Sequence, residues 1–125
     1  INTPISLGEL VDKISILIIK QKNITDETKL DHVKKELDFL QKTLMNYVQK
    51  EEINNYLENL ININSKLWNI EDDIRECERK KLFDQTFIDL ARSVYFTNDE
   101  RAKVKNDINK TFGSELVEVK SYEEY

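Results

Sequence analysis

The sequence feature that most constrains the fold is a run of apolar residues spaced alternately three and four positions apart. Its members are Ile53, Tyr56, Leu60, Ile63, Leu67, Ile70, Ile74 and Cys77. This is the a/d pattern of a helix that packs along a seam. A second run with the same spacing consists of Leu30, Val33, Leu37, Leu40, Leu44 and Tyr47. The two runs predict two long helices, over residues 26–48 and 52–81.

The register of the pattern slips by two residues between the two runs. Continuing the first run would place its next seam positions at Glu51 and Asn54 rather than at Ile53. We therefore predict a tight turn at residues 49–52, with the two long helices side by side as a central hairpin. No glycine or proline marks the turn, so the alternative is one long continuous helix in an elongated coiled-coil dimer.

The composition predicts a single all-α domain over residues 1–125. Hydrophobic residues make up 39% and charged residues 34% of the chain, which contains only two glycines and one proline. An all-β fold needs more turn residues than this. A chain of this length typically forms one domain with one core.

The N-terminal segment carries a helix start signal. Pro4 disfavours helix in the residue before it, so residues 1–5 are expected to be an extended lead-in. Ser6 and Glu9 have the spacing of a capping box, which predicts a helix over residues 7–22. Apolar residues occur on several sides of this helix, as is typical of a helix that lies centrally in a bundle or at a subunit interface.

The C-terminal third predicts two shorter helices and an arm. The first helix is expected over residues 84–96. Thr97 and Glu100 form a second capping-box spacing, which predicts a separate helix over residues 98–112. Residues 113–125 alternate weakly in polarity and are expected to form an extended arm that lies on the bundle, with the N-terminal lead-in as a possible pairing partner. The predicted architecture is an antiparallel helical bundle.

Charge and cysteine content exclude several classes. The net charge of -5 argues against general nucleic-acid binding, which depends on Lys and Arg neutralising phosphates. A single cysteine excludes an intrachain disulfide, and the chain opens on no leader-like pattern. The most apolar run, Ile14–Ile19, is too short to cross a membrane. We expect a cytoplasmic protein without a membrane segment.

Five runs of the sequence carry a resemblance: TPISLGELVDKI (3–14), LWNIEDDIR (67–75), FIDLARSVY (87–95), NDERA (98–102) and GSELVEVKSY (113–122). They are similar to segments of a family of small proteins of unknown function from bacteria, phages and marine metagenomes. The resemblance covers nearly the whole chain except the second helix and the turn after it. It implies no particular activity, ligand or cofactor. It implies a pattern of polar positions: Glu9, Asp12, Lys13, Trp68, Glu71, Asp72, Arg75, Arg92, Ser93, Tyr95, Asn98, Asp99, Arg101 and Lys120.

The densest polar cluster, residues 68–79, lies on the same helix as the 53–77 seam. One interpretation is a ligand pocket, in which this cluster meets polar residues of the C-terminal helices and of the first helix. The other is a structural salt-bridge network that fixes how the helices dock, with Trp68 as a packing residue. The candidate ligand-binding residues are Glu71, Asp72, Arg75, Arg92, Tyr95, Asn98, Asp99, Arg101, Glu9 and Asp12.

Catalytic chemistry has weaker support in the sequence. Paired carboxylates on helices hold Mg²⁺ in small helical nucleotide pyrophosphatases. The pairs available here are Glu9 with Asp12, and Asp73 with Glu76 or Glu71 with Asp72. His32 is expected to be a solvated helical residue, and Cys77 occupies a seam position without a base beside it. We predict no bound metal and no cofactor.

Two functional hypotheses therefore remain. The first is a non-enzymatic helical interaction or assembly module, expected to be a homodimer whose exposed apolar surface is covered by the partner subunit. The alternative is a small-ligand or phosphate-binding protein that uses the candidate polar residues, conceivably as a metal-dependent nucleotide hydrolase.

Overall fold

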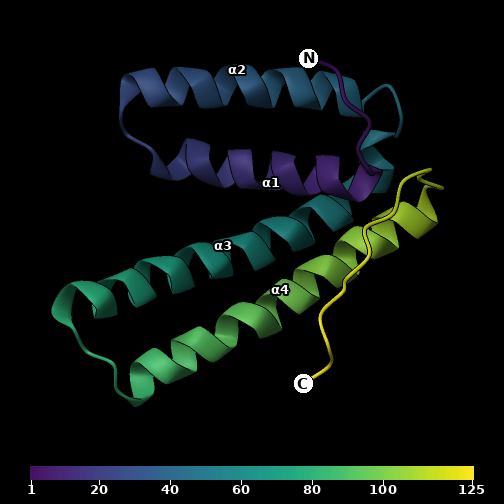
Figure 1. Ribbon diagram of the computed structural model, residues 1–125. Helices are drawn as coiled ribbons and strands as arrows, with labels where there is room; N and C mark the ends of the chain where they lie inside the picture. Colours follow the sequence, from purple (N-terminus) through teal and green to yellow (C-terminus); the bar gives the residue numbers. More distant parts are fainter.

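The computed structural model describes residues 1–125 and contains four helices and no strand (Figure 1). The helices are α1 (Leu7–Asn23), α2 (Glu27–Leu44), α3 (Lys50–Lys80) and α4 (Gln85–Thr111). The all-α prediction is confirmed. None of the four helices is both long enough and apolar enough to cross a bilayer.

Helix α1 lies at the centre of the fold. It packs against each of the other three helices, whereas α2 packs against α1 alone (Figure 1). Its apolar residues point to several sides, and Val11 and Ile14 are completely buried. Together with Leu10 and Leu17, they form one core with apolar residues of α2, α3 and α4. Of the two positions that its sequence predicted, central in a bundle or at a subunit interface, α1 takes the central one within the chain.

The chain reverses between the two apolar runs, but the predicted hairpin of these two helices is wrong. Helix α2 ends at Leu44 and the backbone turns before α3 begins at Lys50, so the alternative of one continuous helix is also wrong. Helices α2 and α3 do not pack against each other. The stripe of α2 instead buries Val33 and Leu37 against α1, because α1 offers apolar side chains on the side that faces α2.

The long hairpin of this fold is formed by α3 and α4, which make the most extensive helix–helix contact in the molecule. The prediction of two short C-terminal helices is wrong, because α4 runs unbroken through Thr97. A capping-box spacing such as that of Thr97 and Glu100 does not by itself end the preceding helix. A glycine, a proline or another break in the backbone is also needed, and none lies beside Thr97. Thr97 is 1% exposed and serves as a packing residue in the middle of α4.

The helix ends have well-defined caps. The Ser6 Oγ accepts a hydrogen bond from the Glu9 backbone N–H at 3.1 Å, and the Asp84 carboxylate accepts one from the Phe87 N–H at 3.3 Å. Gly113 takes a φ of 65°, which lets the Ser114 N–H donate to the Asn109 carbonyl at 2.9 Å and close the last turn of α4.

The residues after Gly113 form neither helix nor strand. They run back along α4 in an extended path (Figure 1). Since the structure contains no strand, the expected pairing between this segment and the N-terminal residues does not occur. We call residues 114–125 the C-terminal arm.

Burial is divided sharply along the α3–α4 hairpin. All 21 buried residues of the protein lie within residues 6–70 and 97–109, and none lies within residues 71–96. The segment without buried residues comprises the end of α3, the loop and the first half of α4, and we call it the distal hairpin. Helix α1 thus covers one half of the hairpin and leaves the other half uncovered.

The close approach of α1 to α4 gives a first prediction. A Cβ atom at Gly8 would lie 2.4 Å from the Lys105 carbonyl oxygen, so the backbones must separate to accept it. Gly8→Ala should lower the free energy of unfolding by about 1–3 kcal/mol, measured by urea denaturation, although the same change in an unobstructed helix is stabilising.

The other glycine provides the control for this prediction. A Cβ at Gly113 would meet nothing within 4 Å, so Gly113→Ala carries only the cost of its positive φ, about 1–2 kcal/mol. A Gly8→Ala variant as stable as the wild type would show that α1 and α4 are not in close contact.

Candidate functional site

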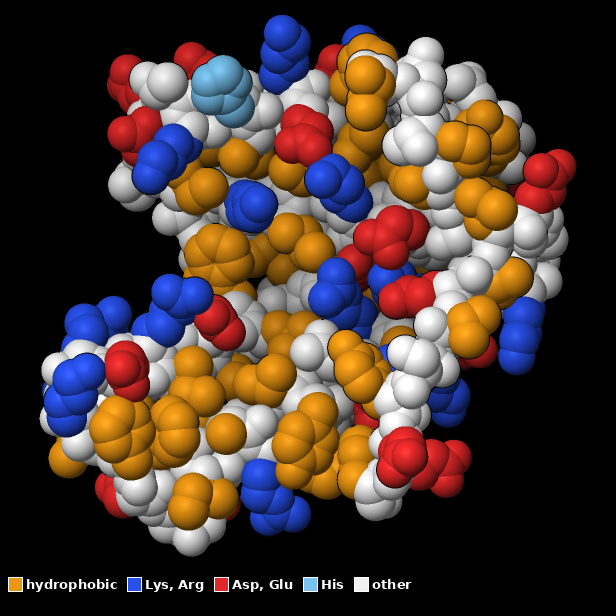
Figure 2. Space-filling model, viewed as in Figure 1, with side chains coloured by type: hydrophobic (Ala, Val, Ile, Leu, Met, Phe, Trp, Pro, Cys, Tyr) orange, Lys and Arg blue, Asp and Glu red, His pale blue; other side chains and the backbone are white.

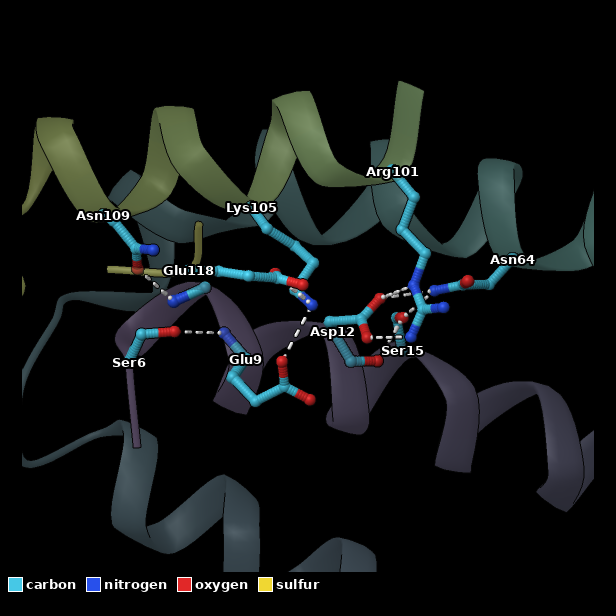
Figure 3. A network of polar contacts seen from close by, with 10 residues as sticks. Ser6, Glu9, Asp12, Ser15, Asn64, Arg101, Lys105, Asn109 and Glu118 are labelled. Carbon is cyan, nitrogen blue, oxygen red and sulfur yellow. Dashed lines mark hydrogen bonds and ion pairs between the residues drawn. The ribbon is translucent and has the colours of Figure 1, made fainter. Parts of the chain in front are cut away.

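A buried carboxylate links the central helix to the α3–α4 hairpin. Asp12 of α1 is 1% exposed and accepts two hydrogen bonds from Arg101 of α4, from Nε to Oδ1 at 2.9 Å and from Nη2 to Oδ2 at 2.5 Å (Figure 3). The Asn64 Nδ2 of α3 donates to the same Oδ1 at 2.9 Å. The hydrogen bond to Asp12 raises the pKa of Arg101 above its ordinary value. Three helices therefore meet at one charged group.

Ser15 completes this junction. The Asn64 Nδ2 also donates to the Ser15 Oγ at 2.8 Å, and that hydroxyl donates to the Asp12 backbone carbonyl at 2.6 Å. Neither Ser15 nor Asn64 was a candidate from the sequence. Ser15 carries one signal, because a polar residue within the apolar run Ile14–Ile19 requires a buried partner, whereas Asn64 stands among polar residues and carries none.

A second charged junction lies one turn along α4. Lys105 is 5% exposed, and its Nζ lies 2.8 Å from the Glu9 carboxylate of α1 and 2.7 Å from the Glu118 carboxylate of the C-terminal arm. Burial lowers the pKa of Lys105, but the hydrogen bonds to Glu118 and Glu9 outweigh it, so the pKa is raised. Glu9 therefore binds Lys105 and does not close the capping box with Ser6.

The N-terminus of α1 is fixed by the same helix. The Asn109 Oδ1 accepts a hydrogen bond from the Gly8 N–H at 2.7 Å (Figure 3). We call the side chains of the two junctions, together with those that cap the start of α1, the polar network. It consists of Ser6, Glu9, Asp12, Ser15, Asn64, Arg101, Lys105, Asn109 and Glu118.

A groove of about 510 Å³ lies beside the polar network, between α1 and the α3–α4 hairpin. Figure 2 shows this side of the molecule hollowed between the two, with hydrophobic side chains in the recess. The volume lies within the range of small-molecule sites. The apolar lining residues are Ile16, Ile19, Leu67, Trp68 and Val94, and the polar ones are Asn64, Glu71, Asp72, Arg75, Asn98 and Arg101.

Five of the ten candidate residues from the sequence line this groove, namely Glu71, Asp72, Arg75, Asn98 and Arg101. Glu9 and Asp12 line a smaller hollow of about 210 Å³ on the other side of Arg101, together with Lys13, Lys20 and Glu36. Arg101 borders both spaces because its side chain crosses from α4 to α1. The structure thus places six other candidates around the spaces that Arg101 borders.

The other three candidates, Arg92, Tyr95 and Asp99, lie on a different face of α4. Tyr95 packs against Phe96 and against Tyr125 of the C-terminal arm, with ring centroids 4.9 and 5.3 Å apart. The Arg92 guanidinium lies 6.0 Å from the Phe96 ring centre. In an unbroken helix, residues 92, 95 and 99 share one face, whereas residues 94, 98 and 101 share another. The predicted single pocket containing all ten residues does not form.

Asp99 holds the end of the C-terminal arm. Its carboxylate pairs with Lys120 and accepts a hydrogen bond from the Tyr125 hydroxyl. The hydrogen bond from Lys120 lowers the pKa of Asp99. The hydrogen bond to Asp99 raises the pKa of Tyr125 to about 12. Asp99 is therefore an anchor for the arm and is directed away from the groove.

Most of the carboxylates that the sequence offers as metal ligands are engaged with basic side chains, and only Asp72 and Asp73 make no ion pair. Glu9 binds Lys105, Asp12 binds Arg101, and Glu71 binds Arg75 at 2.9 Å. No three His, Cys, Asp or Glu side chains lie close enough together to hold a metal ion.

Comparison with known proteins places the chain in a family. The sequence model of a family of unknown function (DUF6165) matches residues 1–125, so the chain belongs to that family. Searches of curated proteins and of solved structures found no match. The function must therefore be argued from the site itself.

The junction at Asp12 gives a second prediction. Replacing Asp12 alone by leucine leaves the Arg101 charge without its partner in a largely buried position. Asp12→Leu should lower the free energy of unfolding by about 2–4 kcal/mol, whereas Asp12→Leu with Arg101→Met should recover at least half of that loss. Denaturant unfolding of both variants measures the difference. If the double variant were no more stable than the single one, an unpaired charge would not be the cause.

Proposed function

We propose that this protein is a non-enzymatic helical assembly module that forms a homodimer through its distal hairpin. The observation that carries the proposal is the absence of any buried residue within residues 71–96. A pair of helices needs a further layer to bury its apolar seam. Helix α1 supplies that layer for the rest of the hairpin, so a partner is expected to supply it here.

The apolar side chains of the distal hairpin support the proposal. Phe83 is 54% and Ile88 46% exposed, and Leu82 between α3 and α4 is similarly open to solvent. Burial of each such side chain contributes about 1.5–3 kcal/mol. Several of them close together form the kind of apolar patch that marks a protein–protein interface.

The polar network supports a structural role for the charged residues. Its ion pairs join α1, α4 and the C-terminal arm, and the hydrogen bonds of Asn64 add α3. Its charged groups are thus paired with one another, whereas acid–base chemistry requires a group that is free to exchange a proton with a substrate. The exposed His32 on α2 lies apart from the network. The chemistry of the site thus favours assembly over catalysis.

A matched pair of variants tests the homodimer. Ile88→Glu places a charge on the proposed interface and should raise the dimer dissociation constant by about thirtyfold or more. Phe39→Glu alters an apolar residue of α2 that is 68% exposed and should leave dissociation unchanged. Sedimentation equilibrium measures both, with the wild type expected at twice the chain mass of 14.8 kDa.

The same experiment can contradict the proposal. A wild-type protein that sediments only at the single-chain mass over the full concentration range would exclude a homodimer. Equal effects of the two variants would place the interface outside the distal hairpin.

Small-ligand binding in the groove is the second candidate function. The observation that favours it is that Arg101 binds Asp12 through Nε and Nη2, while its Nη1 donates to no protein group (Figure 3). Trp68 and Leu67 line the same space. A ligand with a phosphate or carboxylate acceptor and a flat apolar body would fit this combination of groups.

A thermal-shift screen with inorganic phosphate, nucleotides, sugar nucleotides and divalent metal ions tests this candidate. A ligand at a hundred times its dissociation constant should stabilise the protein by about 2.7 kcal/mol. The stabilisation should disappear in Trp68→Leu, which keeps an apolar side chain but loses the flat ring. No shift with any compound, or an equal shift in Trp68→Leu, would remove the candidate.

A further inference from the structure

We infer that the partner of the distal hairpin is a second copy of the chain packed antiparallel to the first, so that the loop end of each hairpin fills the groove of the other. The four helices of the two hairpins then form one bundle. The inference rests on the proposed homodimer and adds its geometry, which the homodimer alone does not specify.

The hairpin carries two complementary features. Its groove extends along α3 from Asn64 to Arg75, about 16 Å at the rise of an α-helix. Its loop end presents Leu82 and Phe83 to solvent. Because both features belong to the same hairpin, a two-fold axis beside it places the loop end of each copy in the groove of the other.

The charges of α3 indicate the same direction of packing. An acidic block, Glu71-Asp72-Asp73, is followed by a basic block, Arg79-Lys80-Lys81. Asp72 and Asp73 make no ion pair within the chain. In a parallel dimer each block would face the same block of the partner, and the like charges would repel. In an antiparallel dimer the acidic block of each chain faces the basic block of the other.

One register satisfies both arguments. With the two-fold axis between Arg75 and Glu76, Asp72 lies opposite the partner's Arg79. In this register the last residue of α3, Lys80, lies opposite the partner's Glu71, so the loop residues Leu82 and Phe83 that follow come next to the partner's groove, which Trp68 lines. The remaining matched charges are Glu71 with the partner's Lys80 and Arg75 with the partner's Glu76, and all four of these groups also make an ion pair within their own chain. The one like-charged pair is Asp73 with the partner's Glu78, and Glu78 already binds Lys81 within its own chain.

Charge reversal tests this geometry. Asp72→Lys and Arg79→Glu each turn two attractive contacts of the dimer into repulsive ones, so each should raise the dissociation constant by about tenfold or more. The double variant Asp72→Lys/Arg79→Glu restores attraction across the axis and should return close to the wild-type value. Both substituted residues are exposed, so folding of the single chain is expected to be unaffected, which circular dichroism checks.

A control variant and the outcomes separate the inference from the proposal on which it rests. Asp38→Lys breaks an exposed ion pair with Lys42 on α2 and should not alter dissociation. The wild type could dimerise while the effects of the two substitutions on the dissociation constant add in the double variant, or while neither substitution has an effect. Either result would show that the antiparallel register is wrong and would leave the homodimer standing. If the wild type is monomeric, the homodimer itself is wrong.

Discussion

The arrangement of this protein depends on one buried charge. The Asp12 carboxylate is removed from water at the centre of the fold, and it must be compensated there because an unpaired buried carboxylate is strongly unfavourable. The bidentate contact with Arg101 and the hydrogen bond from Asn64 supply that compensation. Since its two partners come from α3 and α4, this single group of α1 sets the position of α1 along the α3–α4 hairpin.

The position of α1 determines what the hairpin can do. Close contact at Gly8 and the ion pair between Glu9 and Lys105 fix the start of α1 near the C-terminal end of α4. Helix α1 ends at Asn23, too early to cover the rest of the much longer hairpin. The distal hairpin is therefore left with half-exposed apolar side chains and a groove beside it, and the proposed assembly rests on these two features.

The sequence predicted local structure better than helix pairing. Apolar spacing and the caps at Ser6 and Asp84 placed the helices because both signals act within a few residues. The apolar stripe of α2 shows that one face of the helix is buried, but it does not show which helix covers that face. The predicted pairing with α3 was wrong because α1 covers it. The Thr97 spacing was misleading because burial, not capping, explains that residue. Asp12 and Arg101 were among the candidates, whereas Asn64 and Lys105 were missed because a charged or amide side chain on a polar helix gives no sign of being buried.

Amide hydrogen exchange, resolved by residue and measured over a range of protein concentrations, tests the central claim most directly. The claim is that α1 covers the first part of α3, while a second copy of the chain covers the distal hairpin. The account predicts that protection of residues 53–64 is independent of concentration and that protection of residues 71–96 rises with it. Protection that is independent of concentration in both segments would contradict the account.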